Sequence, residues 1–297
     1  MALAKATALV FGLTLGFVAQ AAQSQATPTV VSPPRSVATE GAETPDATLS
    51  PECRVPSSKL YALNGLTAVK AALAEKRPVR ILAVGAPAAS AGASTSYPVK
   101  LESALERSIP TIDVEIEGRG LPGEIASGAA ERMRAMVAEF EPDLVIWQVG
   151  THDALARVDI EVFADALTDA VQWIKSHDMD VVLVDPLYTA SLADDAYYSS
   201  IVQRVKAIAA REKVPLVQRY EAMRYLASHA GDKGEAHMLG QQFRLNDLGL
   251  RCMAEHVSRA ISLSLLQTPL ATVAPSTEGA RAAAPAEASP AGEPASR

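Results

Sequence analysis

The sequence predicts a three-layer α/β/α domain, because buried strands and amphipathic helices alternate along the chain. Three short apolar runs, residues 79–85, 143–150 and 179–185, are continuous rather than alternating. Continuous runs of this length are typical of strands that are buried on both faces of a parallel sheet. Helices that connect such strands make right-handed crossovers, so they are expected to cover both faces of the sheet.

Two weaker strands and four helices complete the predicted domain. The weaker strands cover residues 112–117 and 215–219. Apolar side chains recur at helical spacing in four further segments. These positions are Ile125, Ala129, Met133, Met136, Val137 and Phe140; Phe163, Leu167, Val171 and Ile174; Ile201, Val205 and Ile208; and Leu250, Met253, Val257 and Ile261. Ligands of parallel sheets bind at the carboxyl ends of the strands, so functional residues are expected in the loops that begin there.

Length and composition favour one sizeable hydrophobic core and exclude some partners. The chain has 297 residues, of which 48% are hydrophobic and 21% charged. Its formal net charge is -7, and the chain contains no Lys/Arg-rich block. A nucleic-acid partner is therefore not expected.

Both ends of the chain differ in composition from residues 51–267, which form the predicted domain. Residues 1–26 combine one lysine, an apolar run and small residues, which is typical of a signal peptide for a periplasmic or secreted protein. No membrane span is expected after its cleavage. Residues 27–50 and 268–297 are rich in Pro, Ala, Ser and Thr or Glu, and are predicted to be a disordered linker and a disordered tail. A working role for the tail, with the domain as its anchor, stays open.

The two cysteines, Cys53 and Cys252, are expected to form a disulfide. Export would bring them into an oxidising compartment. Cys252 lies off the apolar stripe of the last predicted helix, so it is available to a partner outside the deepest core. The alternative is two unrelated thiols.

Four segments in chain order resemble the signature blocks of the SGNH (GDSL-like) hydrolase family. Residues 81–98 resemble its strand and nucleophile loop, 117–123 its glycine-containing oxyanion block, 143–153 its Gly-Thr-Asn-Asp block and 241–249 its Asp-x-x-His block. The resemblance covers most of residues 79–262. It implies a mostly parallel, flavodoxin-like sheet of five strands and, for an intact member, esterase or acylhydrolase activity.

The departures from the family pattern fall on the catalytic positions. Pro87 stands where the family has its nucleophilic serine, and proline has neither a hydroxyl nor an N–H. His152 replaces the oxyanion-binding asparagine, while Gln241 and Arg244 replace the catalytic Asp and His. Arg244 cannot act as a base, because a guanidinium stays protonated. Gly120 alone matches, so the resemblance implies a pseudoenzyme that binds a ligand of the cell envelope.

An active esterase is the alternative interpretation. Ser90 or Ser94 would then be a displaced nucleophile, with His152 or His237 as its base and Asp232 to orient His237. The substrate would be a glycan or lipid ester of the envelope.

A ligand-binding pocket is expected around Gly120, His152 and Arg244. Its fixed positive charge would suit a carboxylate or a phosphate. The alternatives for Arg244 are exposure to solvent or an ion pair with a carboxylate such as Asp153. No compact set of His, Cys and acidic residues has the spacing of a metal site, so neither a metal nor a cofactor is expected.

Overall fold

Six strands form the sheet of this protein, for which a computed structural model describes residues 44–85, 95–229, 238–240 and 243–267. In chain order they are β1 (Tyr61–Ala62), β2 (Val79–Val84), β3 (Val114–Arg119), β4 (Leu144–Gln148), β5 (Asp180–Val184) and β6 (Leu216–Val217). Their spatial order is β1-β6-β5-β4-β2-β3, and only β1 runs antiparallel to its neighbour.

The predicted fold class is confirmed, and the predicted number of strands is corrected from five to six. The five parallel strands have the flavodoxin-like order that the resemblance implied. The additional strand β1 pairs Tyr61 with Val217 at the edge of the sheet. Two residues are too few to produce a recognisable pattern of apolar side chains, so sequence reasoning missed this strand.

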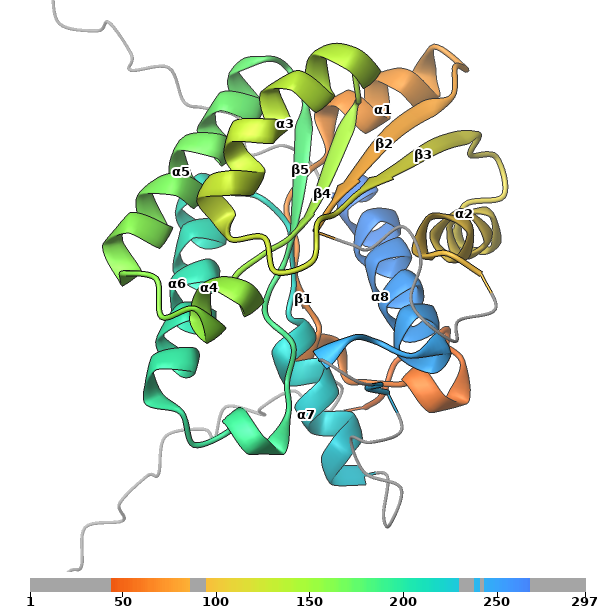
Figure 1. Ribbon diagram of the computed structural model, residues 1–297. Helices are drawn as coiled ribbons and strands as arrows, with labels where there is room; N and C mark the ends of the chain where they lie inside the picture. Colours follow the sequence, from red (N-terminus) through yellow and green to blue (C-terminus); the bar gives the residue numbers. More distant parts are fainter. Residues whose placement is uncertain (1–43, 86–94, 230–237, 241–242, 268–297) are drawn as a thin grey trace, which may run out of the picture. The chain divides into compact units, whose positions relative to one another are not determined.

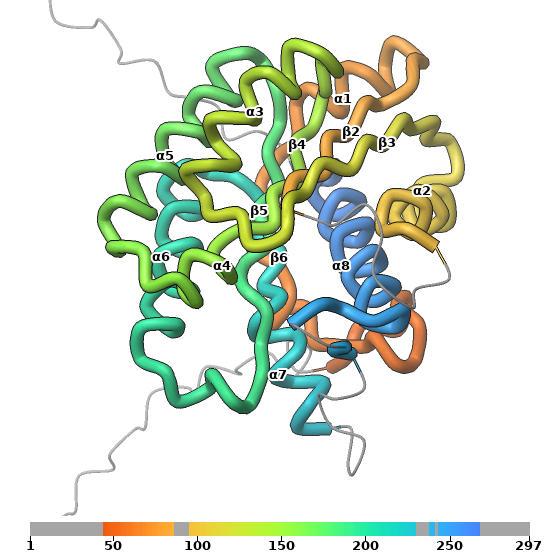
Figure 2. Tube along the Cα trace, viewed as in Figure 1, coloured from red at the N-terminus to blue at the C-terminus, as the bar shows by residue number. Residues whose placement is uncertain are grey.

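The helices lie in two layers, one on each face of the sheet (Figure 1). They are α1 (Thr67–Ala74), α2 (Tyr97–Ser108), α3 (Ala126–Phe140), α4 (Thr151–Leu155), α5 (Ile160–Ser176), α6 (Ala196–Glu212), α7 (Arg219–His229) and α8 (Asp247–Leu265). Side chains of α1, α2 and α8 share one buried cluster, and those of α3, α5 and α6 share the other. The tube in Figure 2 shows the same two groups on opposite sides of the central strands.

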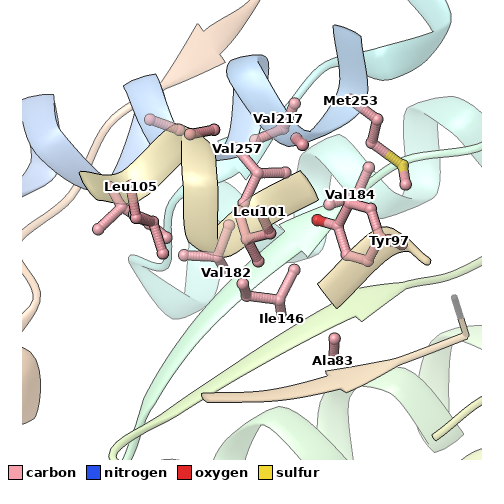
Figure 3. Packing of buried hydrophobic residues seen from close by; sticks show 14 of the residues in the cluster. Ala83, Tyr97, Leu101, Leu105, Ile146, Val182, Val184, Val217, Met253 and Val257 are labelled. Atoms are coloured by element: carbon pink, nitrogen blue, oxygen red, sulfur yellow. The ribbon is translucent and has the colours of Figure 1, made fainter. Parts of the chain in front are cut away.

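Alternate residues of each central strand enter opposite clusters, which explains the continuous apolar runs. In β2, Ile81 and Ala83 pack in the cluster of α2 and α8, whereas Leu82 packs in the cluster of α3 and α5. Figure 3 shows Ala83, with Ile146 and Val182 of the neighbouring strands, facing apolar side chains of α2 and α8. A strand with a helix layer on each face has no polar side to expose.

The predicted disulfide is present and fastens the beginning of the domain to α8. Cys53 and Cys252 are bonded, with their Cα atoms 5.0 Å apart. His256 lies one turn further along α8 and is buried, with its Nε2 2.7 Å from the carbonyl oxygen of Cys53.

Contacts with α8 also begin before residue 51, within the segment that composition assigned to the linker. Arg259 donates from Nε to Asp46 at 2.9 Å, and Glu255 accepts a hydrogen bond of 2.9 Å from the backbone N–H of Ser50. Composition alone does not reveal these contacts, because their partners lie about 200 residues further along the chain. The predicted signal peptide, the rest of the linker and the tail lie outside the described residues.

No helix in the described part of the chain is long and apolar enough to cross a membrane.

Candidate functional site

A pocket of about 240 Å³ opens at the carboxyl ends of the parallel strands. Residues that follow β2, β3 and β4 line it, and α8 contributes Leu250 and Met253. This is the edge at which the sequence predicted a ligand site.

Two glycines allow the chain to turn sharply beneath the pocket. Gly85 has φ +79°, and a Cβ atom there would lie 2.3 Å from the carbonyl oxygen of Gln148. Gly150 has φ +93° and is the N-terminal cap of α4. These conformations are readily available only to glycine. They bring Gln148 close to the end of β2 and start the short helix that carries His152.

The structure brings together three of the residues that the sequence predicted for the site. Gly120, His152 and Arg244 all line the pocket, although they follow β3, follow β4 and precede α8. The remaining candidates lie outside the described residues. They are Pro87, Ser90, Ser94, Asp232, His237 and Gln241.

Burial and nearby charges together set the pKa of His152. Burial lowers the pKa of its ring, and the cations Arg219 and Arg244 lower this pKa further, while Asp153 opposes the shift. A lowered pKa keeps the imidazole neutral at neutral pH. His152 is therefore a candidate hydrogen-bond donor or acceptor rather than a third positive charge.

The acidic residues of the pocket have other partners. Asp153 is 1% exposed and accepts a hydrogen bond of 2.8 Å from the N–H of Ala126, at the start of α3. Glu124 binds Arg132 through both carboxylate oxygens, at 2.5 and 2.8 Å. Among the described residues, no ion pair joins Arg244 to Asp153, so this alternative for Arg244 is not what the structure shows.

Arg219 is a pocket residue that sequence reasoning missed. It begins α7 directly after the last strand and is only 6% exposed. Its Nε donates to the carbonyl oxygen of Asp185 at 2.9 Å, and its Nη1 donates to Oε1 of Gln148 at 2.8 Å. Sequence reasoning placed residue 219 at the end of a weak strand, where an isolated arginine is usually a surface residue. Its position at the carboxyl end of that strand was the available signal.

Asp185, next to Arg219, is fully buried and only partly hydrogen-bonded. One carboxylate oxygen accepts from the N–H of Tyr220 at 2.8 Å, and the other has no partner among the described residues. Burial raises the pKa of Asp185 to about 7, and Arg219 opposes the shift. Near neutral pH, Asp185 therefore offsets only part of the charge of Arg219.

The described polar side chains of the pocket are mainly hydrogen-bond donors, and two of them are positively charged. Thr151 is the one hydroxyl side chain in its described lining, and its Oγ1 accepts a hydrogen bond of 3.1 Å from the N–H of Leu187. No described group of three or more His, Cys, Asp or Glu residues is placed to hold a metal ion. Arginine, histidine and glutamine donors predominate, so the site is suited to an acceptor or an anion.

Solved structures of hydrolases share the fold at low sequence identity. A lipase/acylhydrolase from Enterococcus faecalis is 22% identical with a TM-score of 0.51, over 62% of this chain and 96% of that protein. An acetyl xylan esterase is 18% identical with a TM-score of 0.54, over 62% of this chain and all of that protein. A two-domain esterase active on acetylated mannans is 18% identical with a TM-score of 0.58, over 72% of this chain and 59% of that protein. These likenesses establish the fold and leave the activity open.

No curated protein sequence is significantly similar to this chain. Residues 52–266, which include all six strands and the pocket, match the non-GDSL lipase-like family. The chain therefore belongs to the non-GDSL lipase-like family.

Proposed function

We propose that this protein is a non-catalytic member of its hydrolase family that binds an anionic or ester-bearing ligand of the cell envelope in the pocket. The observation that supports this most is the location of Arg244. Arg244 lines the pocket, and the resemblance of residues 241–249 to the family's Asp-x-x-His block assigns it to the position of the catalytic base.

The chemistry of the replaced side chains supports the loss of catalysis. A guanidinium cannot accept a proton from a nucleophile, and Pro87 has no hydroxyl. Loss of one member of a catalytic triad typically lowers the rate by several orders of magnitude. Nucleophile, base and acid positions are all changed here.

An exported location belongs to the same proposal. Disulfides form and persist in oxidising compartments, and Cys53 is bonded to Cys252. The apolar segment near the N-terminus, which follows one lysine and precedes small residues, also supports export.

An active esterase is the second candidate, and one feature of the pocket favours it. His152 is half-buried, has a lowered pKa and forms no side-chain hydrogen bond with any described residue. A neutral imidazole of this kind is able to act as a general base if a serine approaches it. Ser90 and Ser94 are the candidates.

Ester hydrolysis distinguishes the two candidates. Purified protein should hydrolyse p-nitrophenyl acetate no faster than its Ser90→Ala, Ser94→Ala and His152→Ala variants, after subtraction of the rate without protein. The controls are a denatured sample and Ser176→Ala, because Ser176 lies on the surface of α5 and outside the pocket. Turnover that one pocket variant abolishes and Ser176→Ala preserves would contradict the non-catalytic proposal.

A further inference from the structure

Neither arginine of the pocket forms a salt bridge with a described carboxylate, and Asp185 offsets only part of the charge of Arg219. Two carboxylates line the same pocket, but Glu124 is paired with Arg132 and Asp153 accepts from the backbone of α3. Neither Arg219 nor Arg244 forms an ion pair with a described residue. A buried cation without a paired anion is costly, because the surrounding protein solvates charge poorly.

Arg219 is held with one end of its guanidinium unused. Its Nε and Nη1 donate to the carbonyl oxygen of Asp185, to Gln148 and to the sulfur of Met253. Its Nη2 donates no hydrogen bond to any residue in the described ranges. Because arginine only donates, the oxygen of the Gln148 amide must face it, which fixes the orientation of both groups. Arg219 is thus a buried and pre-oriented donor at the wall of the pocket.

Arg219 begins α7 and Arg244 precedes α8, yet both cations act on the imidazole of His152. Each lowers the pKa of His152. Arg219, Arg244 and His152 all line this one pocket. Electrostatic attraction for an anion is strongest in such a partly enclosed site.

Much of the remaining lining of the pocket is apolar and extends to the surface. Ile125, Leu187, Leu250 and Met253 line its interior. Leu121 and Phe243 also line it and are 54% and 40% exposed, so they belong to the few large apolar side chains on the described surface. Exposed apolar side chains at the edge of a pocket mark the path of an apolar ligand.

We propose that the pocket binds a carboxylate that carries an apolar chain, with the carboxylate between Arg219 and Arg244 and the chain against Leu121 and Phe243. This inference rests on the proposed non-catalytic function and specifies its ligand class. A carboxylate is favoured over a phosphate because only a few side chains of the lining donate hydrogen bonds and many of the others are apolar. Gln148 is a positioning residue that holds the guanidinium of Arg219.

Calorimetric titration with sub-micellar decanoate tests the proposal, with methyl decanoate, acetate and inorganic phosphate as comparison ligands. Decanoate should bind at least about tenfold more tightly than each comparison ligand, because only decanoate combines the charge with the chain. Arg219→Gln should weaken decanoate binding at least about tenfold, because it removes the buried charge. Arg224→Gln is the matched control, because Arg224 is an exposed arginine on the same helix, paired with Glu221.

A second pair of variants keeps the test decisive if Arg219→Gln does not fold. Arg244→Gln should also weaken decanoate binding at least about tenfold, and Phe243→Ser should weaken decanoate while leaving the affinity for acetate unchanged. Equal affinity for methyl decanoate and decanoate, preferential binding of phosphate, or unchanged decanoate affinity in Arg244→Gln would each overturn the inference.

The ester assay separates failure of this inference from failure of the proposed function. Serine-dependent turnover with arginine-dependent decanoate binding would refute only the non-catalytic function. Absence of both turnover and decanoate binding would refute only the carboxylate ligand.

Discussion

Two aspartates at opposite ends of β5 differ in how many of their carboxylate oxygens accept hydrogen bonds. Asp180, at the start of the strand, accepts hydrogen bonds from the N–H groups of Thr67 and Val69, both at 3.0 Å, one on each carboxylate oxygen. Asp185, just after the strand, has one oxygen bonded to Tyr220 and one without a described partner. Both residues are buried.

The same contrast holds for the arginines at the two edges of the sheet. At the edge opposite the pocket, Arg77 binds Asp143 through two hydrogen bonds of 2.8 and 2.6 Å. At the pocket edge, Arg219 binds a carbonyl and an amide oxygen instead of a carboxylate. One edge has complete polar pairs that stabilise the fold, and the other retains unused hydrogen-bonding capacity, which is typical of a binding site.

The largest expected effect concerns Asp185 and pH. Its folded-state pKa, about 7, lies above the ordinary value of 3.8, so between these values the folded state holds a proton that the unfolded state has lost. Stability therefore falls as pH rises through this window. At pH 8, Asp185→Asn should be more stable than the parent by up to about 4 kcal/mol, and the difference should vanish near pH 4.

Urea unfolding at a series of pH values measures this difference. Asp169→Asn on the exposed face of α5 is the matched control and should follow the parent at every pH. A pH-independent gap between Asp185→Asn and the parent would contradict the proposed titration of Asp185.

At the opposite edge, Asp180→Ala should destabilise the protein by about 2 kcal/mol at neutral pH. The change leaves the N–H groups of Thr67 and Val69 without their carboxylate partner at the start of α1. Urea unfolding would show a lower midpoint with an unchanged slope. Asp169→Ala should change stability by no more than about 0.5 kcal/mol. Equal stability of the two variants would mean that the Asp180 hydrogen bonds contribute nothing measurable.

The smallest expected effect is a change in the pKa of His152. Arg244→Gln should raise this pKa toward its ordinary value of 6.5, because Arg244 is one of the cations that lower it. Titration of the imidazole by NMR detects the shift, and Arg224→Gln should leave it unchanged. An unaltered His152 pKa in Arg244→Gln would mean that Arg244 does not act on His152, and it would contradict a shared anion site.

Much of the scaffold could be predicted from the sequence because its signals are local and periodic. The apolar runs at 79–85 and 143–150 correspond to β2 and β4, and the spacing from Phe163 to Ile174 corresponds to α5. The edge at which the pocket opens followed from the parallel topology. The disulfide followed from the number of cysteines together with the expected compartment.

The site was only partly predictable, because its key pairs are distant in sequence. Gly120, His152 and Arg244 were identified through the family blocks, and they do line one pocket. Arg219 and Gln148 were missed, since nothing in either segment indicates that residues 71 positions apart share a hydrogen bond.

The sequence by itself determined the fold class, the five parallel strands and the two-sided burial of the sheet, whereas the replacement of the family's catalytic residues stays a prediction from the resemblance. Only the tertiary structure decided that Asp180 is fully hydrogen-bonded, that Asp185 is not, and that Arg219 is buried beside the pocket. The physical reason is that periodicity records whether a side chain faces the core, whereas hydrogen-bond satisfaction and pKa depend on partners that folding brings together.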